Sequence, residues 1–168
     1  MARRICMFLL ILVGFLVQST LFRALSLGGV SPNLLIILTS SFGFMRGKKE
    51  GMFVGFFCGI LMDILFGNVL GVYALIYLVI GYLNGFFASI FYPEDIKLPM
   101  VLISTSELFY CILVYLFKYL IQGRTNFGFY LTHMILPEIV YTILVTIIVY
   151  KGILFVNEKL EDFERRRA

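Results

Sequence analysis

The sequence predicts an all-α, polytopic membrane protein with six transmembrane helices. Of its 168 residues 61% are hydrophobic and only 14% are charged, whereas soluble domains are nearer half apolar and a quarter charged. The charges also cluster, which leaves the long uncharged runs that membrane-spanning helices need. Finally, glycine or aspartate occupies every fourth position from Gly51 to Gly71, a spacing typical of helices that pack closely in lipid.

Arg3 and Arg4 precede the first apolar run, as in a signal peptide, but no small-x-small cleavage site follows. Because five more apolar runs come after it, this run is expected to remain as the first transmembrane helix. Pro32 and Asn33 open the second run, where proline suits a first helical turn because its missing N–H is not needed there. A basic turn, residues 46–50, separates the second helix from the third.

Gly67 and Asn68 form a turn signal between the third and fourth helices. The stretch 122–136 is expected as an aromatic loop followed by a short interfacial turn. Pro137 then starts the last helix, and Glu138 in its first turn is favoured by the helix dipole. The expected transmembrane domain covers residues 1–156, with helices at about 5–22, 32–45, 51–66, 70–91, 98–120 and 137–156. A charged cytoplasmic tail, 157–168, follows and is expected to be helical.

The step of four along the third helix places its small residues on one ridge, because four residues advance about 400° around a helix axis. Glycine on such a ridge lets a second helix approach closely, which is the main route to helix pairing in lipid. A second small-residue pair lies on the fourth helix. The residues expected to pack helices or bind a partner are therefore Gly51, Gly55, Gly59, Gly67, Gly71, Gly81 and Gly85.

The basic residues indicate the orientation in the membrane. With six crossings and the amino terminus inside, only three of the 14 Lys and Arg residues fall outside, namely Arg23, Lys118 and Arg124. Because positive charge gathers on the cytoplasmic side, both termini are expected in the cytoplasm. The remaining basic residues lie on the inner side: Arg3, Arg4, Arg46, Lys48, Lys49, Lys97, Lys151, Lys159, Arg165, Arg166 and Arg167.

Signals for an enzyme are missing from the sequence. It has no Walker A loop, dinucleotide-binding glycine fingerprint or nucleophile elbow, and its single histidine, His133, cannot build a histidine-rich metal site. Cys6, Cys58 and Cys111 lie in apolar runs and are interpreted as small buried hydrophobes. No cofactor and no metal is expected. The absence of an extended basic patch gives no reason to expect nucleic acid as a partner.

Three polar residues fall within the expected spans: Asp63, Asn84 and Glu107. A carboxylate at mid-helix costs roughly 3 kcal/mol on insertion scales, so Asp63 should face protein or a wet cavity. Because it shares the glycine ridge, a structural hydrogen bond is favoured over a ligand, proton or ion site. For Glu107 both interpretations stay open, and nothing in the spacing places it near Glu138. Asn84 can hydrogen-bond across helices.

The order and spacing of these motifs resemble the MreD family of rod shape-determining membrane proteins over nearly the whole chain. The resemblance rests on the Pro32-Asn33 helix start, Arg46-Gly, the ladder from Gly51 into Leu61-Met-Asp63-Ile, and the Pro137 helix start. Gly71-Val-Tyr-Ala-Leu and Gly81-Tyr-Leu also fit it. The family often has aspartate after the first of these prolines, where this chain has asparagine.

This resemblance implies a non-enzymatic role in bacterial cell elongation, in the cytoplasmic membrane. The implied partners are MreC, most directly, and then MreB and the RodA–penicillin-binding protein complex that synthesises peptidoglycan. It also implies a fold similar to the S component of energy-coupling-factor transporters.

Two hypotheses follow for the function. In the first, the chain is a membrane scaffold whose glycine faces pack its own core and dock a transmembrane helix of MreC. In the second, it is a transporter-like module that binds a small molecule or lipid in a pocket between helices, lined by Asp63, Asn84 and Glu107.

Overall fold

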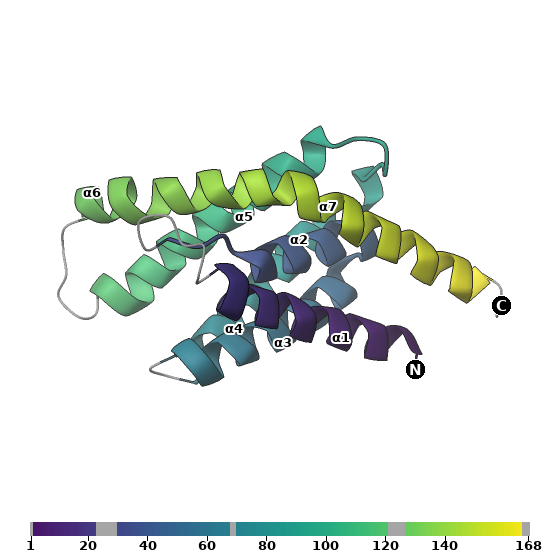
Figure 1. The fold of residues 1–168 in the computed structure, drawn as a ribbon, viewed down its shortest axis with the longest axis horizontal. Helices are drawn as coiled ribbons and strands as arrows, with labels where there is room; N and C mark the ends of the chain where they lie inside the picture. Colours follow the sequence, from purple (N-terminus) through teal and green to yellow (C-terminus); the bar gives the residue numbers. More distant parts are fainter. Residues whose placement is uncertain (1, 23–29, 68–69, 121–126, 166–168) are drawn as a thin grey trace.

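The computed structural model describes residues 2–22, 30–67, 70–120 and 127–165 (Figure 1). The helices are α1 (Ala2–Val17), α2 (Leu34–Arg46), α3 (Lys48–Phe66), α4 (Val72–Asn84), α5 (Lys97–Val114), α6 (Phe127–Tyr130) and α7 (Leu136–Arg165). Wider π-helical turns, η1 (Gln18–Phe22), η3 (Tyr115–Leu120) and η4 (Leu131–Ile135), follow α1, α5 and α6, and a 3-10 turn, η2 (Gly85–Ile90), follows α4. The prediction of an all-α membrane protein is confirmed.

Helix α2 is the centre of the molecule. All of its residues from Leu34 to Phe44 are buried, and it contacts α1, α3, α4, α5 and α7. Figure 1 shows it between α1 and α7. A helix of 13 residues is about 20 Å long at 1.5 Å per residue, which is shorter than the hydrocarbon core of a bilayer. Its apolar side chains meet neighbouring helices along this whole stretch.

Within the described residues, three helical stretches are long and apolar enough to cross a membrane: Val72–Ile90, Lys97–Phe117 and Gly128–Asp162. The apolar parts of α1 and α2, Arg4–Thr20 and Leu34–Arg46, are shorter. Helix α3 has 19 residues but carries three charges in its first turn and Asp63 near its end. The count of six crossings therefore stays a prediction.

The last helix differs from the expected one. Helical structure runs through the described residues from Phe127 to Arg165, so the described part of the expected loop is helical. The described part of the tail is helical as expected, and it continues α7. Pro137 does not start a new helix, because the N–H of Leu136 already bonds to the carbonyl of Leu131 in a π-type turn. That wider turn shifts the hydrogen-bond register, so the missing N–H of the proline is tolerated.

Two glycines with positive φ set the ends of neighbouring helices. Gly47, at φ 95°, is the one residue between α2 and α3, so the expected basic turn at 46–50 mostly forms the start of α3. Gly71, at φ 103°, occupies the cap position before α4. Both values lie in the region that L side chains rarely adopt, which explains glycine at these positions.

Candidate functional site

Helices α3 and α4 pack backbone against backbone along the face of α3 that carries Gly51, Gly55 and Gly59, here called the glycine ladder. A Cβ added at Gly51 would meet the carbonyl of Gly81, and one at Gly55 would meet the backbone of Tyr77. A Cβ at Gly59 would meet the backbone of Ala74. Each would approach closer than the 3.0 Å that real Cβ atoms keep. The missing side chains therefore decide how near the two helices lie.

The same packing continues onto α2 and the start of α3. A Cβ at Gly43 of α2 would lie 2.9 Å from the Gly81 carbonyl oxygen, and one at Gly85 would meet the backbone of Lys48. Gly43 was not among the expected packing residues. The step of four does extend backwards from Gly51 through Gly47 to Gly43, and that signal could have found it.

Gly67 and Gly71 do not belong to this packed face. Gly67 caps the end of α3, its N–H donating to the Asp63 carbonyl at 3.0 Å, and a Cβ on Gly71 would meet nothing within 4 Å. The face formed by Gly51, Gly55 and Gly59 is covered by α4 of the same chain. In the first hypothesis the glycine faces both pack the core and dock a partner; the structure shows the core packing here, and docking stays a prediction.

Asp63 caps the first turn of α4 across the α3–α4 turn. Its Oδ1 accepts a hydrogen bond from the N–H of Tyr73 at 3.0 Å, and its Oδ2 accepts one from Ala74 at 2.8 Å. The residue is only 2% exposed. Both oxygens are engaged by a helix N-terminus, which favours an anion. This geometry fits the structural interpretation of Asp63.

Asn84 joins three helices. Its Nδ2 donates to the Ile80 carbonyl at 2.9 Å and to Ser106 Oγ of α5 at 2.7 Å, and it lies 3.4 Å from Ser40 Oγ of α2. Asn33 makes a second polar junction. It caps α2 by accepting from the Ile36 N–H at 3.3 Å and also accepts from the Tyr77 hydroxyl at 3.0 Å.

Glu107 lies beside Glu138, a proximity that the spacing in the sequence did not indicate. Cys111 Sγ is 3.9 Å from Glu107 Oε1 and 3.7 Å from Glu138 Oε2. The three ligand atoms all fall within 4.8 Å of one another. Two carboxyl groups this close in an apolar interior cannot both carry a charge. The cluster can therefore hold a shared proton or a cation, and the packing of α7 on α5 is what creates it.

The three intramembrane polar residues have different neighbours among the described residues. Asp63 caps α4, Asn84 bonds to α5 and α2, and Glu107 contacts α7. The second hypothesis placed all three around a single ligand; this stays a prediction, while the described contacts of the three residues are with different helices.

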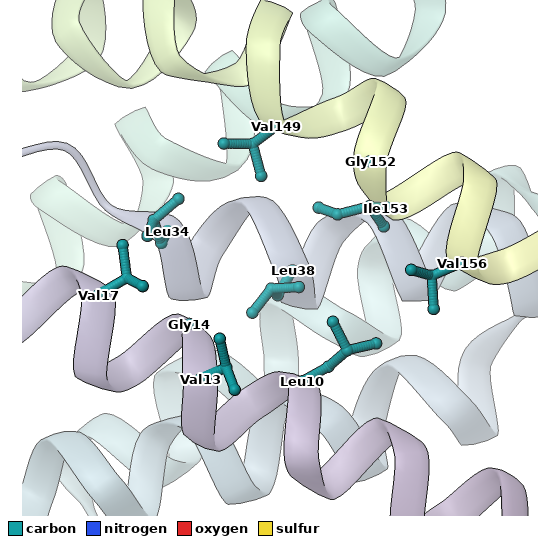
Figure 2. A pocket seen from close by; sticks show the side chains of 10 residues that line it. All are labelled: Leu10, Val13, Gly14, Val17, Leu34, Leu38, Val149, Gly152, Ile153 and Val156. Atoms are coloured by element: carbon teal, nitrogen blue, oxygen red, sulfur yellow. The ribbon is translucent and has the colours of Figure 1, made fainter.

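An apolar groove of about 390 Å³ lies between α1 and α7, with α2 as its floor. Figure 2 shows aliphatic side chains from all three helices converging on it. Each wall also carries a glycine, Gly14 on α1 and Gly152 on α7. The lining residues are Leu10, Val13, Gly14, Val17, Leu34, Leu38, Val149, Gly152, Ile153 and Val156.

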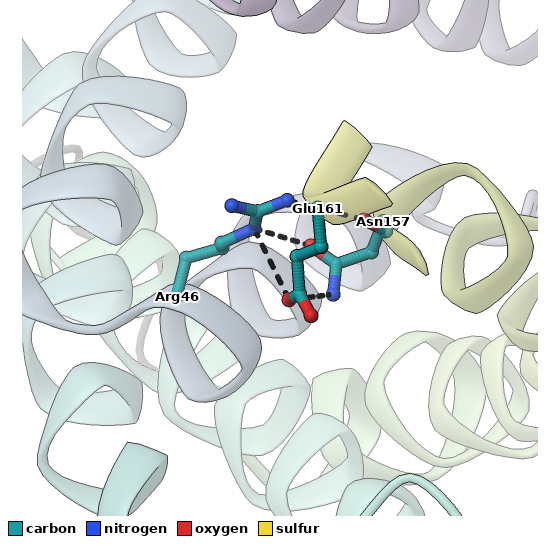
Figure 3. Close-up of polar contacts among 3 residues, drawn as sticks. All are labelled: Arg46, Asn157 and Glu161. Carbon is teal, nitrogen blue, oxygen red and sulfur yellow. Dashed lines mark hydrogen bonds and ion pairs between the residues drawn. The ribbon is translucent and has the colours of Figure 1, made fainter. Parts of the chain in front are cut away.

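A polar clamp joins the end of α2 to α7 (Figure 3). Arg46 donates through Nε to Asn157 Oδ1 and through Nη2 to the Asn157 carbonyl at 3.1 Å. Its Nε also lies 3.9 Å from Glu161 Oε1, which accepts from Asn157 Nδ2 at 3.1 Å. Asn157 is 3% exposed, so this part of the expected cytoplasmic tail is packed against the helix core.

The family model for rod shape-determining protein MreD matches residues 2–155. The chain belongs to the MreD family. As a member it is a membrane protein with a role in rod shape determination. Searches of curated proteins and of solved structures gave no match, so the expected similarity to transporter S components stays a prediction.

The MreD match covers the glycine-packed helices, the Asp63 cap and the groove as far as Ile153. It ends before Asn157 and Glu161. In this MreD-family chain the clamp that holds the end of α2 therefore uses side chains beyond the matched region.

Proposed function

We propose that this MreD-family protein is a non-enzymatic scaffold of the cell-elongation machinery, which binds MreC inside the bilayer. Through MreC it would act with MreB and with the RodA–penicillin-binding protein complex, and so support peptidoglycan synthesis. The observation that carries the proposal is the family match over residues 2–155. The structure supports it with a helix bundle that is tightly packed by glycines on one side and grooved on another.

The groove between α1, α2 and α7 is the surface we propose for MreC. Helices associate in lipid by close van der Waals packing, for which small residues on the contact face are favourable. The α3–α4 ladder already makes such a contact internally. In the groove, by contrast, a Cβ on Gly152 would meet nothing within 4 Å. We expect a transmembrane helix of MreC with an aliphatic ridge to pack between these walls.

We propose that the protein lies in the cytoplasmic membrane with both termini in the cytoplasm. Helix α1 begins and α7 ends at the same end of the molecule (Figure 1). Arg46 binds α7 near its charged end. This arrangement agrees with the gathering of basic residues on one side, which marks the cytoplasmic face.

Site-specific photo-crosslinking in cells tests the MreC surface. A photoreactive amino acid at Val13 or Val149 points into the groove (Figure 2). The matched controls are Ile64 and Leu75, which are 62% and 57% exposed on α3 and α4. We expect crosslinks to MreC from the two groove positions only. Equal crosslinking from all four positions would contradict the proposed surface.

A pair of glycine variants provides a second test. Gly152 and Gly128 both have open space around an added Cβ, so Gly152→Leu and Gly128→Leu should fold equally well. Only Gly152 lines the groove. We expect Gly152→Leu to reduce co-purification of MreC at least about tenfold, the effect of roughly 1.4 kcal/mol, and Gly128→Leu to leave it unchanged. If Gly152→Leu binds MreC normally, the helix docks elsewhere.

A further inference from the structure

Two carboxyl groups and a thiol meet where α7 packs on α5. They belong to Glu107, Cys111 and Glu138, here called the carboxyl–thiol cluster. Glu107 and Cys111 are four positions apart on α5, so they lie one turn apart on the same face of that helix. Glu138, in the first turn of α7, completes the cluster from the other helix. None of the three residues lines the groove proposed for MreC.

The cluster contains a buried acceptor without a partner. Glu107 is 0% exposed, and its Oε2 makes no hydrogen bond with any described residue. The other oxygen of the same carboxyl group, Oε1, lies 3.9 Å from Cys111 Sγ, so this unpaired oxygen is part of the cluster. The described contacts of Glu107 and Glu138 include no basic side chain. A buried negative charge is costly unless a positive group compensates it, and a cation at the cluster would do so.

The distances within the cluster fit a tetrahedral zinc ion. Zinc binds sulfur at about 2.3 Å and carboxylate oxygen at about 2.0–2.2 Å, which separates two such ligands by roughly 3.6 Å across a tetrahedral angle. Cys111 Sγ lies 3.9 Å from Glu107 Oε1 and 3.7 Å from Glu138 Oε2. One ligand atom from each residue falls within 4.8 Å of the other two. The ligands are therefore close to the positions that the ion requires.

The chemistry of the three donors selects the ion. Mg²⁺ and Ca²⁺ take oxygen ligands and gain nothing from a thiol, whereas Cu(I) prefers sulfur to carboxylate. Zn²⁺ binds sulfur and carboxylate oxygen together. Three ligands from the chain leave a fourth tetrahedral position, which the unpaired Oε2 of Glu107 can fill if this carboxylate binds through both oxygens.

The cluster is accessible at one of its members. Glu107 and Cys111 are buried, but Glu138 is only partly buried. An ion can therefore reach the cluster past the Glu138 carboxyl group. It needs no preformed cavity, because its ligands close directly around it.

We propose that Glu107, Cys111 and Glu138 bind one Zn²⁺ ion, which joins the start of α7 to α5. The ion takes the place of the proton that the two carboxyl groups share in the metal-free protein, and the thiol releases its own proton to water when it binds. This site goes beyond the scaffold function and does not depend on MreC binding.

Cobalt spectroscopy of the purified, tag-free full chain tests the proposal. Co²⁺ can replace Zn²⁺, and a thiolate ligand gives it a sulfur-to-metal charge-transfer band that carboxylate and imidazole ligands do not give. The chain has three cysteines, so serine variants assign the band. We expect it in the unaltered chain, in Cys6→Ser and in Cys58→Ser, but not in Cys111→Ser, and one equivalent of Zn²⁺ should remove it. No band in the unaltered chain, or a band that survives in Cys111→Ser, would overturn the proposal.

Thermal unfolding separates a ligand from a structural side chain. Zn²⁺ added to the chelator-treated chain should raise its melting temperature, because an ion that binds only the folded state stabilises that state. Glu107→Gln keeps the shape of the side chain, so without metal it should melt close to the unaltered chain. We expect it to bind Zn²⁺ at least about a hundredfold more weakly, since even the loss of a group that only supports a ligand weakens metal binding 10–100-fold.

The matched control is Glu94→Gln, at an exposed turn residue, which should bind Zn²⁺ as the unaltered chain does. Mg²⁺ at the same concentration should leave all three melting temperatures unchanged. If Zn²⁺ stabilised Glu107→Gln as much as the unaltered chain, Glu107 would not be a ligand and the site would be refuted.

Discussion

The carboxylate of Asp63, near the end of α3, accepts a hydrogen bond from the backbone N–H of Ala74 in the first turn of α4, at 2.8 Å. Its other oxygen binds the N–H of Tyr73 at 3.0 Å. The first N–H groups of a helix have no partner within the helix, and water is scarce at membrane depth. A side chain from the preceding helix thus supplies the cap, while Gly71 takes the positive φ that the turn requires.

Removal of this cap should destabilise the α3–α4 pair. We expect Asp63→Ala to lower the free energy of unfolding by roughly 2 kcal/mol or more, since buried donors are left unpaired. Asp63→Asn should lose less, because one amide oxygen can still accept. Unfolding in detergent measures both, with Glu94→Ala at an exposed turn residue as the control. An Asp63→Ala protein as stable as that control would contradict the capping role.

Glycine substitutions should separate packed positions from open ones. Gly51→Ala and Gly81→Ala each place a Cβ against the backbone of the other helix, so α3 and α4 must move apart. We expect a loss of roughly 1–3 kcal/mol, the range for overpacked cores. Gly128→Ala is the matched control. Its Cβ meets nothing within 4 Å, so the variant should gain up to about 1 kcal/mol, since alanine favours the helix. Equal melting temperatures for all three variants would show that α3 and α4 are not closely packed.

Leucine at Gly55 and Gly59, the next two positions of the glycine ladder, tests the same face more severely. The double variant Gly55→Leu and Gly59→Leu drives two large side chains into the backbone of α4. We expect it to lose folding whether or not MreC is present, which size-exclusion chromatography of the detergent-solubilised protein measures. A folded double variant that had only lost MreC would instead support docking on the ladder.

The Glu107–Glu138 pair should tolerate loss of one charge but not loss of one side chain. Because two such close carboxyl groups cannot both be ionised, Glu107→Gln should change the free energy of unfolding by less than about 1 kcal/mol. Glu107→Ala should lose roughly 2–4 kcal/mol, since it leaves a cavity and an unpaired partner. Thermal unfolding compares them. If Glu107→Gln were as damaging as the alanine variant, the pair would need both charges.

A chelator distinguishes what the carboxyl pair holds. With a shared proton between Glu107 and Glu138, EDTA should leave the melting temperature unchanged. A cation among these two groups and Cys111 would stabilise the fold by mass action, so its removal would lower the melting temperature. A drop that is reversed by one added divalent metal would identify the cluster as a metal site.

The clamp between α2 and α7 should act as a coupled unit. Arg46→Ala leaves the buried amide of Asn157 without its main partner, so a loss of roughly 1–3 kcal/mol is expected. A double-mutant cycle with Asn157→Ala should show a coupling energy above about 0.5 kcal/mol. Lys159→Ala, on the same helix, is the control. If the losses in the free energy of unfolding of the two single variants simply added up in the double variant, the contact would add nothing to stability.

Local features of the chain were predictable from sequence. Composition and charge clustering predicted the all-α membrane class, and the step of four predicted the small-residue face of α3. The Pro32-Asn33 pair predicted a helix start, and Asn33 does cap α2. These features depend on helix periodicity and on caps only a few residues long, so short stretches of sequence contain them.

The choice of neighbour was decided by tertiary structure alone. Periodicity shows that the face of α3 around Gly51 consists of small residues, but only the fold shows that α4 covers this face. The same holds for Glu107 and Glu138, which are 31 positions apart in the chain and meet because α7 crosses α5. The groove is a space between helices from distant parts of the chain. The sequence by itself determined which face of each helix carries small, apolar or polar side chains, because these residue types recur with the period of the helix. The packing of distant helices determined what each face touches, because crossing geometry depends on all the side chains in a contact at once.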